Sequence, residues 1–447
     1  MISSVQMKRL PSLLVALVLA SCATPNSLGA AVSSESSFAI RDVRIFDGER
    51  VIPSGTVVVQ NGLITAVGEH ENLSGVAEVI DGHGQTLLPG LIDAHFHANE
   101  PEAYRVALAF GLTTVIDMFG QYSAFKTKTS LGALSTRPDD EADPLISLLI
   151  TVPAGHGTEY GDFALPKVTT AQECQDAVNT QLDAGATFVK LIYDSGDSWS
   201  PQPVPSLSRE LLTACIQAAH ARGVLAIVHT LSLRQAREAV EAGVDGLAHD
   251  IVDVAPEPAL VQMIAAHHTF IIPTLAALSG AMGQRNDEII LADPLLAPYV
   301  PESGLKTLRK LYPTGFGQGM KPAAMKETLL ELKAAGVAIL AGSDPGNPQT
   351  AEGATFHQEL ELLVAAGLTP VEVLSAATSL PASRFRLPDR GRIAPGLRAD
   401  LVLVRGDPTT DIKMTRDIVT VWKRGKKLDR DAYRARVEAA RQPSHHD

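Results

Sequence analysis

The feature that most constrains the fold is a repeated alternation of short, apolar, β-branched runs with amphipathic helical patterns. Strands alternating with crossover helices are typical of a parallel α/β sheet, and eight such strands suit a (β/α)8 TIM barrel. Several of the helical patterns end in Ala-Gly, a signal that ends a helix before the next strand. We expect strands near 91–96, 112–118, 145–152, 187–193, 224–229, 245–249, 269–275 and 337–343, and helices that include 171–184, 208–221, 233–242, 257–266 and 321–335.

The regions on either side of the predicted barrel, residues 38–89 and 388–430, contain shorter strands and turns, including a hairpin signal at Asn61-Gly62. We expect them to meet as one small β-sandwich domain built from both chain ends. The barrel then occupies 90–387, and 431–447 form a C-terminal tail. Residues 276–320 within the barrel are too long for a simple connection. They are predicted to be a lid, with a packed surface excursion as the alternative.

Single polar residues stand at the carboxyl ends of the predicted strands. His95 and His97 are two residues apart at the end of the first, so both imidazoles face the same site. Neutral imidazole is a common zinc ligand. Any one such residue is more often structural than functional, but active sites of these barrels lie where the strands end. Later strands end in four further candidates: Lys190, His229, His249 and Asp344.

Together these residues resemble the metal-dependent amidohydrolase superfamily, particularly its imidazolonepropionase-like and prolidase-like (Xaa-Pro dipeptidase-like) members. The resemblance covers roughly residues 38–430. Besides the ordered strand-end residues, the stretch 357–370 resembles the last barrel helix of the family. The stretches 376–382 and 391–401 resemble its return to the β domain.

The resemblance implies a site with two divalent metal ions, with zinc as the expected metal. Lys190 would bridge the ions after carbamylation by carbon dioxide, because a free ammonium group cannot ligate a cation. Burial lowers the pKa of an amine and leaves it reactive, which fits the apolar surroundings of Lys190. The alternative is a structural lysine that reaches a carboxylate such as Asp194. The implied ligands are His95, His97 and Asp344 for one ion and His229 and His249 for the other.

The implied mechanism is attack of a metal-bridging hydroxide on an amide carbonyl. Asp344 would act as the general base that passes the proton to the leaving amine. His156, in a glycine-rich loop at 153–161, is a candidate for orienting or polarising the substrate carbonyl, and Tyr193 is a second candidate for substrate binding. The alternative for both is a residue at the barrel rim with no part in the chemistry.

Two departures from the family pattern bear on the substrate. The dipeptidases of the family have His-Ala-His-Gly where this chain has His229-Thr230-Leu231-Ser232, and many relatives have Glu-His-Gly in place of Ala248-His249-Asp250. We expect a hydrolase of C–N bonds in a small amide, an N-acyl amino acid or a cyclic amide. A short-peptide peptidase, a lactonase, a phosphotriesterase and a non-catalytic binding lipoprotein remain alternatives.

The beginning of the chain has the layout of a secretory signal. Lys8-Arg9 precede an apolar stretch at 13–20, and Leu19-Ala20-Ser21-Cys22 resembles a bacterial lipoprotein signal. Cleavage before Cys22 would leave that cysteine lipid-modified and residues 23–37 as a tether. The protein would then be anchored at the cell envelope, on the periplasmic side of the outer membrane. A secreted or soluble periplasmic protein is the alternative.

Cysteine content and net charge bear on disulfide bonding and on the kind of binding partner. Cys174 and Cys215 lie on predicted helices of a large core, so we expect no disulfide framework. The net charge of -12 argues against nucleic acid as a partner. The expected partner is a small-molecule substrate, with membrane contact only through the lipid anchor and a homo-oligomer as an open option.

Overall fold

The computed structural model describes residues 37–100, 102–120, 138–160 and 165–441. Cys22, the predicted signal sequence and nearly all of the predicted tether therefore lie outside the described residues. None of the described helices combines the length and the apolar character that crossing a membrane requires.

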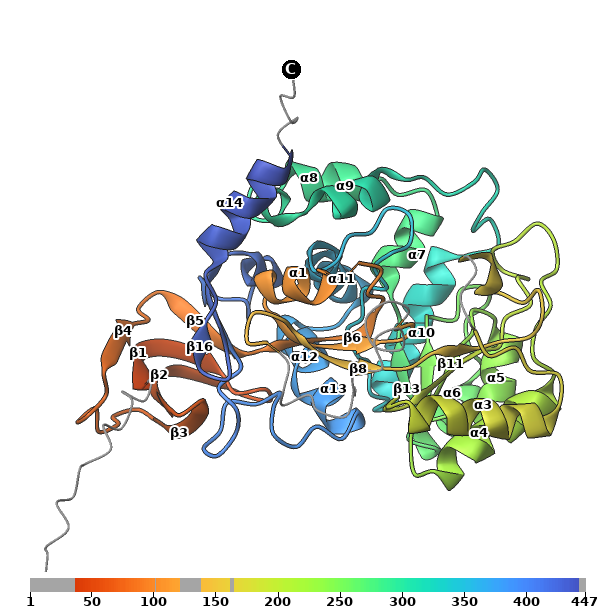
Figure 1. The fold of residues 1–447 in the computed structure, drawn as a ribbon, viewed down its shortest axis with the longest axis horizontal. Helices are drawn as coiled ribbons and strands as arrows, with labels where there is room; N and C mark the ends of the chain where they lie inside the picture. Colours follow the sequence, from red (N-terminus) through yellow and green to blue (C-terminus); the bar gives the residue numbers. More distant parts are fainter. Residues whose placement is uncertain (1–36, 101, 121–137, 161–164, 442–447) are drawn as a thin grey trace, which may run out of the picture. The chain divides into compact units, whose positions relative to one another are not determined.

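Parallel strands alternating with helices form a TIM-barrel-like α/β fold (Figure 1). Their pairing gives two parallel sheets, one in the order β6-β7-β8 and the other in the order β13-β12-β11-β10-β9. Seven of the eight predicted strand positions are confirmed, and they contain eight strands because the position 145–152 holds two. Their bounds are β6 Leu91–Phe96, β7 Leu112–Asp117, β8 Asp143–Ile146, β9 Leu149–Ile150, β10 Val189–Ile192, β11 Ala226–His229, β12 Gly246–Ala248 and β13 Phe270–Ile272.

The predicted strand at 337–343 is not a regular strand. It makes one isolated bridge, between Ile339 and Ile271 of β13. Further hydrogen bonds nevertheless connect this segment with both neighbours: Leu340 N donates to Ile271 O (2.9 Å), and Ala94 N of β6 donates to Ala341 O (2.8 Å). The segment thus runs between β13 and β6, and the left-handed backbone of Asp344 (φ 50°) follows at its end.

The predicted strand at 145–152 is divided into β8 and β9. Between them, Ser147 Oγ and Leu148 N both donate to Gln181 Oε1, each at 3.1 Å. Lys190 N in turn donates to Ser147 Oγ (3.0 Å). Side-chain hydrogen bonds therefore replace the regular strand pairing at this point, where the third strand lies beside β10.

The helices predicted from periodicity are confirmed to within two residues at each end. Side-chain capping explains the starts of two of them: Thr170 and Glu173 form a capping box before α3, and the Ser208 side chain accepts from Leu211 N at the start of α4. The bounds are α1 Ala103–Ala109, α3 Ala171–Asp183, α4 Arg209–Ala221, α5 Leu233–Glu241, α6 Pro258–Ala266, α7 Leu275–Ala281, α8 Asn286–Ala292, α9 Glu302–Arg309, α10 Pro322–Ala334, α11 Ala354–Ala366, α12 Pro370–Ala376, α13 Ser379–Arg384 and α14 Arg430–Arg441.

The expectation of no disulfide is wrong. Cys174 of α3 and Cys215 of α4 are disulfide-bonded, with their Cα atoms 4.9 Å apart. Both side chains are fully buried. The sequence placed both on helices but did not show that these two helix faces meet.

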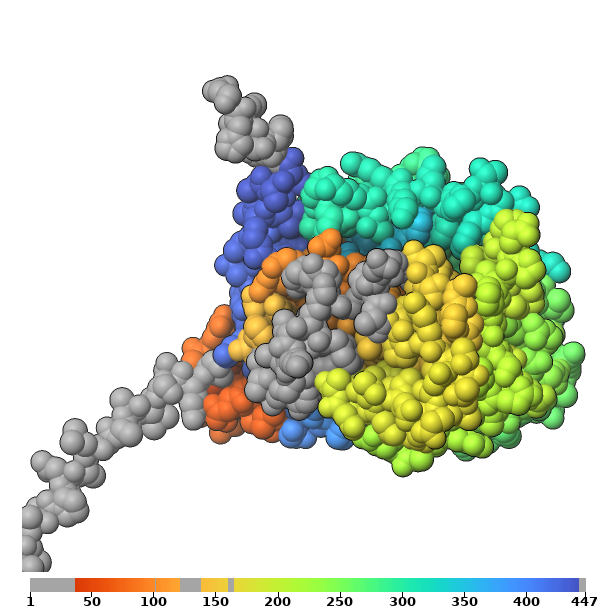
Figure 2. Space-filling model, turned by 45° about the vertical axis from the view of Figure 1, so that its right-hand side comes forward, coloured from red at the N-terminus to blue at the C-terminus, as the bar shows by residue number. Residues whose placement is uncertain are grey.

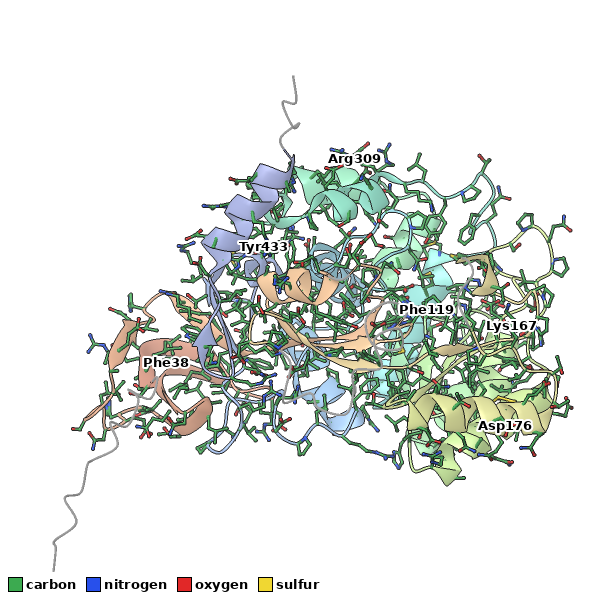
Figure 3. All side chains as sticks on the ribbon, viewed as in Figure 1. Phe38, Phe119, Lys167, Asp176, Arg309 and Tyr433 are labelled. Atoms are coloured by element: carbon green, nitrogen blue, oxygen red, sulfur yellow. A yellow bond between two sulfur atoms is a disulfide. The ribbon has the colours of Figure 1, made fainter. Side chains whose placement is uncertain are left out.

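Strands from the two ends of the chain form one further sheet, in the order β16-β15-β14-β5-β1-β2-β3, with β4 also paired to β1. Phe38 of β1 stacks on Trp422 of β15 inside it, with ring centroids 5.1 Å apart (Phe38 is labelled in Figure 3). The bounds are β1 Ser37–Phe46, β2 Val51–Gln60, β3 Leu63–Gly68, β4 Glu78–Asp81, β5 Gln85–Pro89, β14 Leu401–Arg405, β15 Ile418–Lys423 and β16 Lys426–Lys427.

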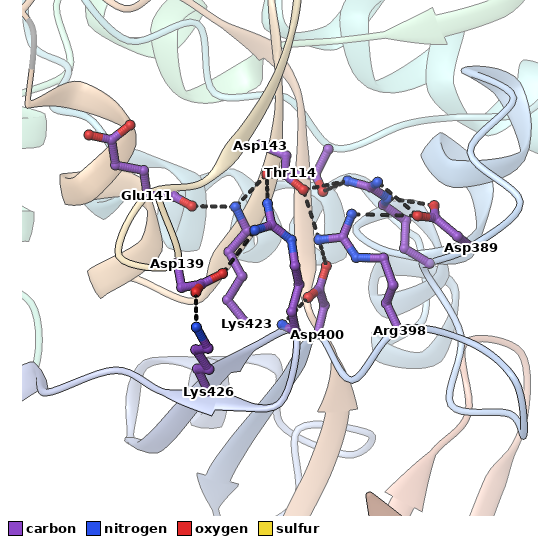
Figure 4. A network of polar contacts seen from close by, with 11 residues as sticks. Thr114, Asp139, Glu141, Asp143, Asp389, Arg398, Asp400, Lys423 and Lys426 are labelled. Carbon is purple, nitrogen blue, oxygen red and sulfur yellow. Dashed lines mark hydrogen bonds and ion pairs between the residues drawn. The ribbon is translucent and has the colours of Figure 1, made fainter. Parts of the chain in front are cut away.

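A buried carboxylate joins this sheet to the parallel strands (Figure 4). Asp143, the first residue of β8, is fully buried and contacts four cationic side chains from the C-terminal part of the chain. Burial by itself raises the pKa of Asp143, but the charges of these cations outweigh burial and leave the pKa below its usual value. The contacts are Lys423 Nζ (2.5 Å), Arg398 Nη2 (2.7 Å), Arg424 Nη2 (2.8 Å) and Arg390 Nη1 (3.0 Å).

The segment 276–320 contains most of α7 and all of α8 and α9. Ile290, Val300 and Leu308 are buried in a cluster with residues of α1, α11 and α14. Tyr433 Oη of α14 donates to Tyr299 O (3.2 Å), and the blue α14 lies against this region in Figure 2. This part of the segment is therefore packed, as the surface-excursion alternative expects, whereas its ends reach the cavity described below.

Candidate metal centre and active site

The first half of the candidate site lies where β6 and the 338–344 segment end. His97 Nε2 is 3.0 Å and His95 Nε2 is 3.5 Å from Asp344 Oδ1. His249 Nδ1 is 3.9 Å from Asp344 Oδ2. The ligand atoms of His95, His249 and Asp344 lie within 4.8 Å of one another, in the spacing that a shared metal ion requires. The structure therefore brings together three residues that the sequence separates by up to 249 positions.

The second half consists of His229 and His249, whose rings face each other. His229 Nδ1 is 2.8 Å from His249 Nε2. The other nitrogen of each ring has its own partner: His229 Nε2 lies 2.9 Å from Asp194 Oδ2, and His249 Nδ1 lies 2.7 Å from Thr274 Oγ1. A carboxylate or hydroxyl on the outer nitrogen is the arrangement that fixes the ring orientation of a metal-binding histidine.

Three residues of this region have left-handed backbones: His249 (φ 79°), Thr274 (φ 51°) and Asp344 (φ 50°). Such conformations are costly for residues other than glycine, and they persist where the surrounding structure holds them in place. One contributor is Glu359 of α11, whose Oε2 accepts a hydrogen bond from Ala276 N (2.7 Å), two residues after Thr274. Two candidate ligands, His249 and Asp344, and one hydrogen-bond partner of a ligand, Thr274, are therefore held in strained conformations.

Lys190 of β10 is fully buried, and its Nζ has no hydrogen-bond partner among the described residues. Desolvation lowers the pKa of Lys190 to about 7, although the charge of Asp344 acts in the opposite direction. Asp194 is occupied by His229 Nε2, Gly196 N (2.8 Å) and Trp199 Nε1 (2.9 Å). The alternative that Lys190 is a structural lysine paired with Asp194 is therefore wrong.

The buried histidines are neutral at pH 7, which is the form that binds metals. Desolvation, followed by the charge of Lys190, lowers the pKa of His95 well below its usual value. Desolvation and the neighbouring His229 do the same for His249. The pKa of His229 falls to about 4, mainly through burial, although Asp194 raises it.

The donor set fits divalent metal ions. Within the described residues, His95 Nδ1, His97 Nδ1 and Lys190 Nζ are buried without hydrogen-bond partners. Unpaired polar atoms are expensive in a protein interior, so their occurrence on three residues that line one cavity indicates a site built for a ligand. Imidazole and carboxylate together suit zinc and similar ions.

The two predicted substrate-binding residues have different positions. His156 lines the cavity, with its Nδ1 2.5 Å from Glu159 Oε1 and its ring centroid 4.9 Å from that of His229. Tyr193 is not among the residues that line the cavity, and its hydroxyl donates to Glu238 Oε2 of α5 (2.5 Å). The structure therefore does not bring Tyr193 to this cavity, because the end of β10 directs its side chain towards α5.

A cavity of about 280 Å³ opens over the candidate ligands. Much of its remaining wall comes from residues that sequence reasoning missed. Trp199 lies in the loop after β10, and Phe119, labelled in Figure 3, follows β7. Tyr312, Phe316 and Met320 come from the end of the segment 276–320. The prediction that this segment is a lid was the one sequence signal that could have pointed to them.

Comparisons with known proteins agree with this geometry. The profile of the amidohydrolase family matches residues 86–428. An uncharacterized protein of Mycobacterium bovis is 28% identical over 318 residues, covering 69% of this chain and 76% of that protein. The imidazolonepropionase of Desulfotalea psychrophila is 22% identical over 413 residues, covering 84% of this chain and 92% of that enzyme.

Among solved structures, a Xaa-Pro dipeptidase with methionine bound in its active site superimposes with a TM-score of 0.68. The superposition covers 88% of this chain and all of that one, at 21% identity, and it supports the fold alone. The profile match extends over most of the chain, from β5 to β16, and includes every candidate ligand. The chain belongs to the amidohydrolase family and is a hydrolase that acts on carbon–nitrogen bonds.

Proposed function

We propose that this protein is a metal-dependent hydrolase of a small amide, with His95, His97, His229, His249 and Asp344 as ligands of two ions. The observation that carries the proposal is the convergence of neutral imidazoles and one carboxylate on a buried lysine that has no described partner. The neutral amine is the form that reacts with carbon dioxide, and a pKa of about 7 keeps a large share of Lys190 in that form at neutral pH. A carbamate on Lys190 would supply a carboxylate shared by the two ions. Zinc is the proposed metal because imidazole ligands predominate.

His95, His97, His229, His249 and Asp344 would hold divalent ions, which would supply the positive charge that acidifies a water and polarises the scissile carbonyl. Asp344 accepts the proton of the attacking water and delivers it to the nitrogen of the leaving amine. His156 donates a hydrogen bond to the substrate oxygen from the cavity wall. Asp194 and Thr274 hold the rings of His229 and His249 in position.

The test is amine release from a panel of simple amides by the wild type and by Asp344→Asn. We expect the substitution to reduce kcat by about a hundredfold or more, because no group remains to carry the proton. If the wild type also hydrolyses a matched ester, and Asp344→Asn loses that activity to a similar extent, the activity extends to lactone-like substrates. Full activity in Asp344→Asn would contradict the assigned role, and ligand binding without any turnover would favour a binding protein.

We also propose that the protein is exported and lipid-modified at Cys22, and that it is held on the periplasmic side of the outer membrane. The disulfide between Cys174 and Cys215 supports an oxidising compartment, because disulfides rarely persist in the cytosol. The test is incorporation of labelled palmitate in a bacterial host. We expect labelling of the wild type and none of Cys22→Ser; equal labelling of both proteins would refute the proposal.

A further inference from the structure

The cavity wall contains two chemically different groups of residues. One group is the candidate metal ligands, and the other includes three aromatic side chains that contact one another. The rings of Trp199 and Phe316 lie 5.1 Å apart between centroids, tilted by 38°. Tyr312 stacks on Phe316 at 4.5 Å, with an angle of 28° between the rings. We call these three residues the aromatic cluster.

The aromatic cluster is linked to the reaction centre. Trp199 Nε1 donates to Asp194 Oδ2 (2.9 Å), the same oxygen that lies 2.9 Å from His229 Nε2. The His156 ring lies between the two, with centroids 5.0 Å from Trp199 and 4.9 Å from His229. One carboxylate therefore orients both a metal-binding imidazole and the indole beside which a substrate would lie.

The backbone also holds the cluster together. Gly317 N donates to Trp199 O (3.1 Å), which joins the loop after β10 to the loop that carries Phe316. A Cβ atom added at Gly319 would lie 2.6 Å from Ser198 O, so the two loops approach as closely as a glycine allows. The aromatic walls are thus formed before a ligand binds, which lowers the entropic cost of binding.

The three residues of the aromatic cluster carry no charged side chain. The ionisable groups in the described cavity wall are Lys190, Asp344, His156, the candidate histidine ligands and the Tyr312 phenol. Burial and the charge of Asp344 raise the pKa of Tyr312, so the phenol stays neutral. A charged group placed against Trp199 and Phe316 would lose its hydration without gaining a partner from these two rings.

Building on the proposed amide hydrolysis, we propose that the substrate carries an uncharged aromatic ring that packs against Trp199 and Phe316. The scissile amide then lies at the metal ligands, with the ring on either its acyl or its amine side. Ring pairs in offset or tilted contact contribute beyond the burial of apolar area. An aromatic substrate should therefore exceed its saturated analogue by about 3- to 10-fold in kcat/KM.

The kinetic test uses two matched pairs of amides. One pair contains the propylamides of phenylacetic and cyclohexylacetic acid, and the other contains the acetamides of benzylamine and cyclohexylmethylamine. A methylene group insulates the amide from the ring in each compound, so the ring changes packing more than reactivity. We expect a 3- to 10-fold preference for the aromatic member in at least one pair, and loss of the preference in Phe316→Leu. Tyr299→Leu is the control, because it removes an aromatic ring that does not line the cavity. This variant should keep the preference for the aromatic substrate.

A binding test is independent of turnover. The chain contains two tryptophans, so Trp422→Phe leaves Trp199 as the only source of indole fluorescence. Phenylacetone and cyclohexylacetone carry the same rings but have no amide bond to hydrolyse. We expect phenylacetone to change the emission of Trp199 at a several-fold lower concentration than cyclohexylacetone does.

The two tests separate this proposal from the proposed function. Turnover of both members of each pair at equal kcat/KM, with equal binding of the two ketones, would overturn the aromatic assignment and leave amide hydrolysis intact. Tighter binding of phenylacetone without turnover of any amide would support the aromatic assignment and count against amide hydrolysis. No binding and no turnover would overturn both.

Discussion

Replacing Asp194 by asparagine should weaken metal binding through the protonation of His229. Asp194 accepts from three groups: Gly196 N (2.8 Å), Trp199 Nε1 (2.9 Å) and His229 Nε2 (2.9 Å). Asparagine offers one acceptor oxygen and one amino group. If the oxygen keeps the bond to Gly196, the amino group faces His229 Nε2 and favours the tautomer whose proton is on Nδ1, where it blocks metal binding.

Loss of such a partner typically reduces metal affinity by about 10- to 100-fold, or about 1.4 to 2.8 kcal/mol. Isothermal titration of the metal-free protein with zinc measures this directly. The matched control is Asp197→Asn, three residues further on, where an exposed carboxylate contacts Ser195 Oγ (2.8 Å) and Arg234 Nη2 (3.2 Å). Equal zinc affinity in the two variants would refute the positioning role of Asp194.

Three further predictions concern stability, each measured by denaturant unfolding. Asp143→Asn should lower the free energy of unfolding by about 3 to 5 kcal/mol, because it leaves buried cations without their shared carboxylate. The control Asp389→Asn, at a half-exposed carboxylate, should lower it by less than about 1 kcal/mol. Equal losses in the two variants would contradict this reasoning. Burial and the charge of Arg416 lower the pKa of His357 to about 3. Below about pH 6.5, His357 therefore binds a proton in the unfolded state but not in the native state. The free energy of unfolding should therefore fall by up to about 1.4 kcal/mol per pH unit between about pH 6.5 and pH 3. His357→Gln should make this pH dependence weaker. An unchanged slope in His357→Gln would exclude His357 as the source of the pH dependence. Replacing both Cys174 and Cys215 by serine should lower the free energy of unfolding by about 3 to 4 kcal/mol, because the disulfide closes a loop across 41 positions. An undiminished free energy of unfolding would contradict a stabilising role of the disulfide.

The sequence predicted the strand-end residues because their signal is local. A histidine or aspartate that closes an apolar run is visible in the sequence, and the ends of parallel strands meet at one edge. The disulfide and the break between β8 and β9 gave no such signal. Cys174 and Cys215 meet only because α3 and α4 pack together, and the break depends on Gln181, more than 30 residues further along the chain.

The hydrogen-bond partners of the candidate ligands could not be predicted from the sequence either. Asp194 was considered as a partner of Lys190, but the loop after β10 turns its carboxylate to His229 and Trp199. Thr274 reaches His249 from a left-handed backbone that no pattern around position 274 indicates. Tyr193 follows β10 as expected, yet its hydroxyl contacts Glu238 rather than the cavity. Such contacts depend on loop conformation, which local periodicity does not encode.

The most direct test of the two-metal account is the metal content per chain. The soluble form that begins after Cys22 would be purified without chelator and in the presence of bicarbonate, next to its Lys190→Ala variant. We predict close to two equivalents of divalent metal in the parent protein and a clear decrease in Lys190→Ala. One equivalent or less in both proteins, unaffected by the substitution, would contradict a lysine-bridged pair of ions.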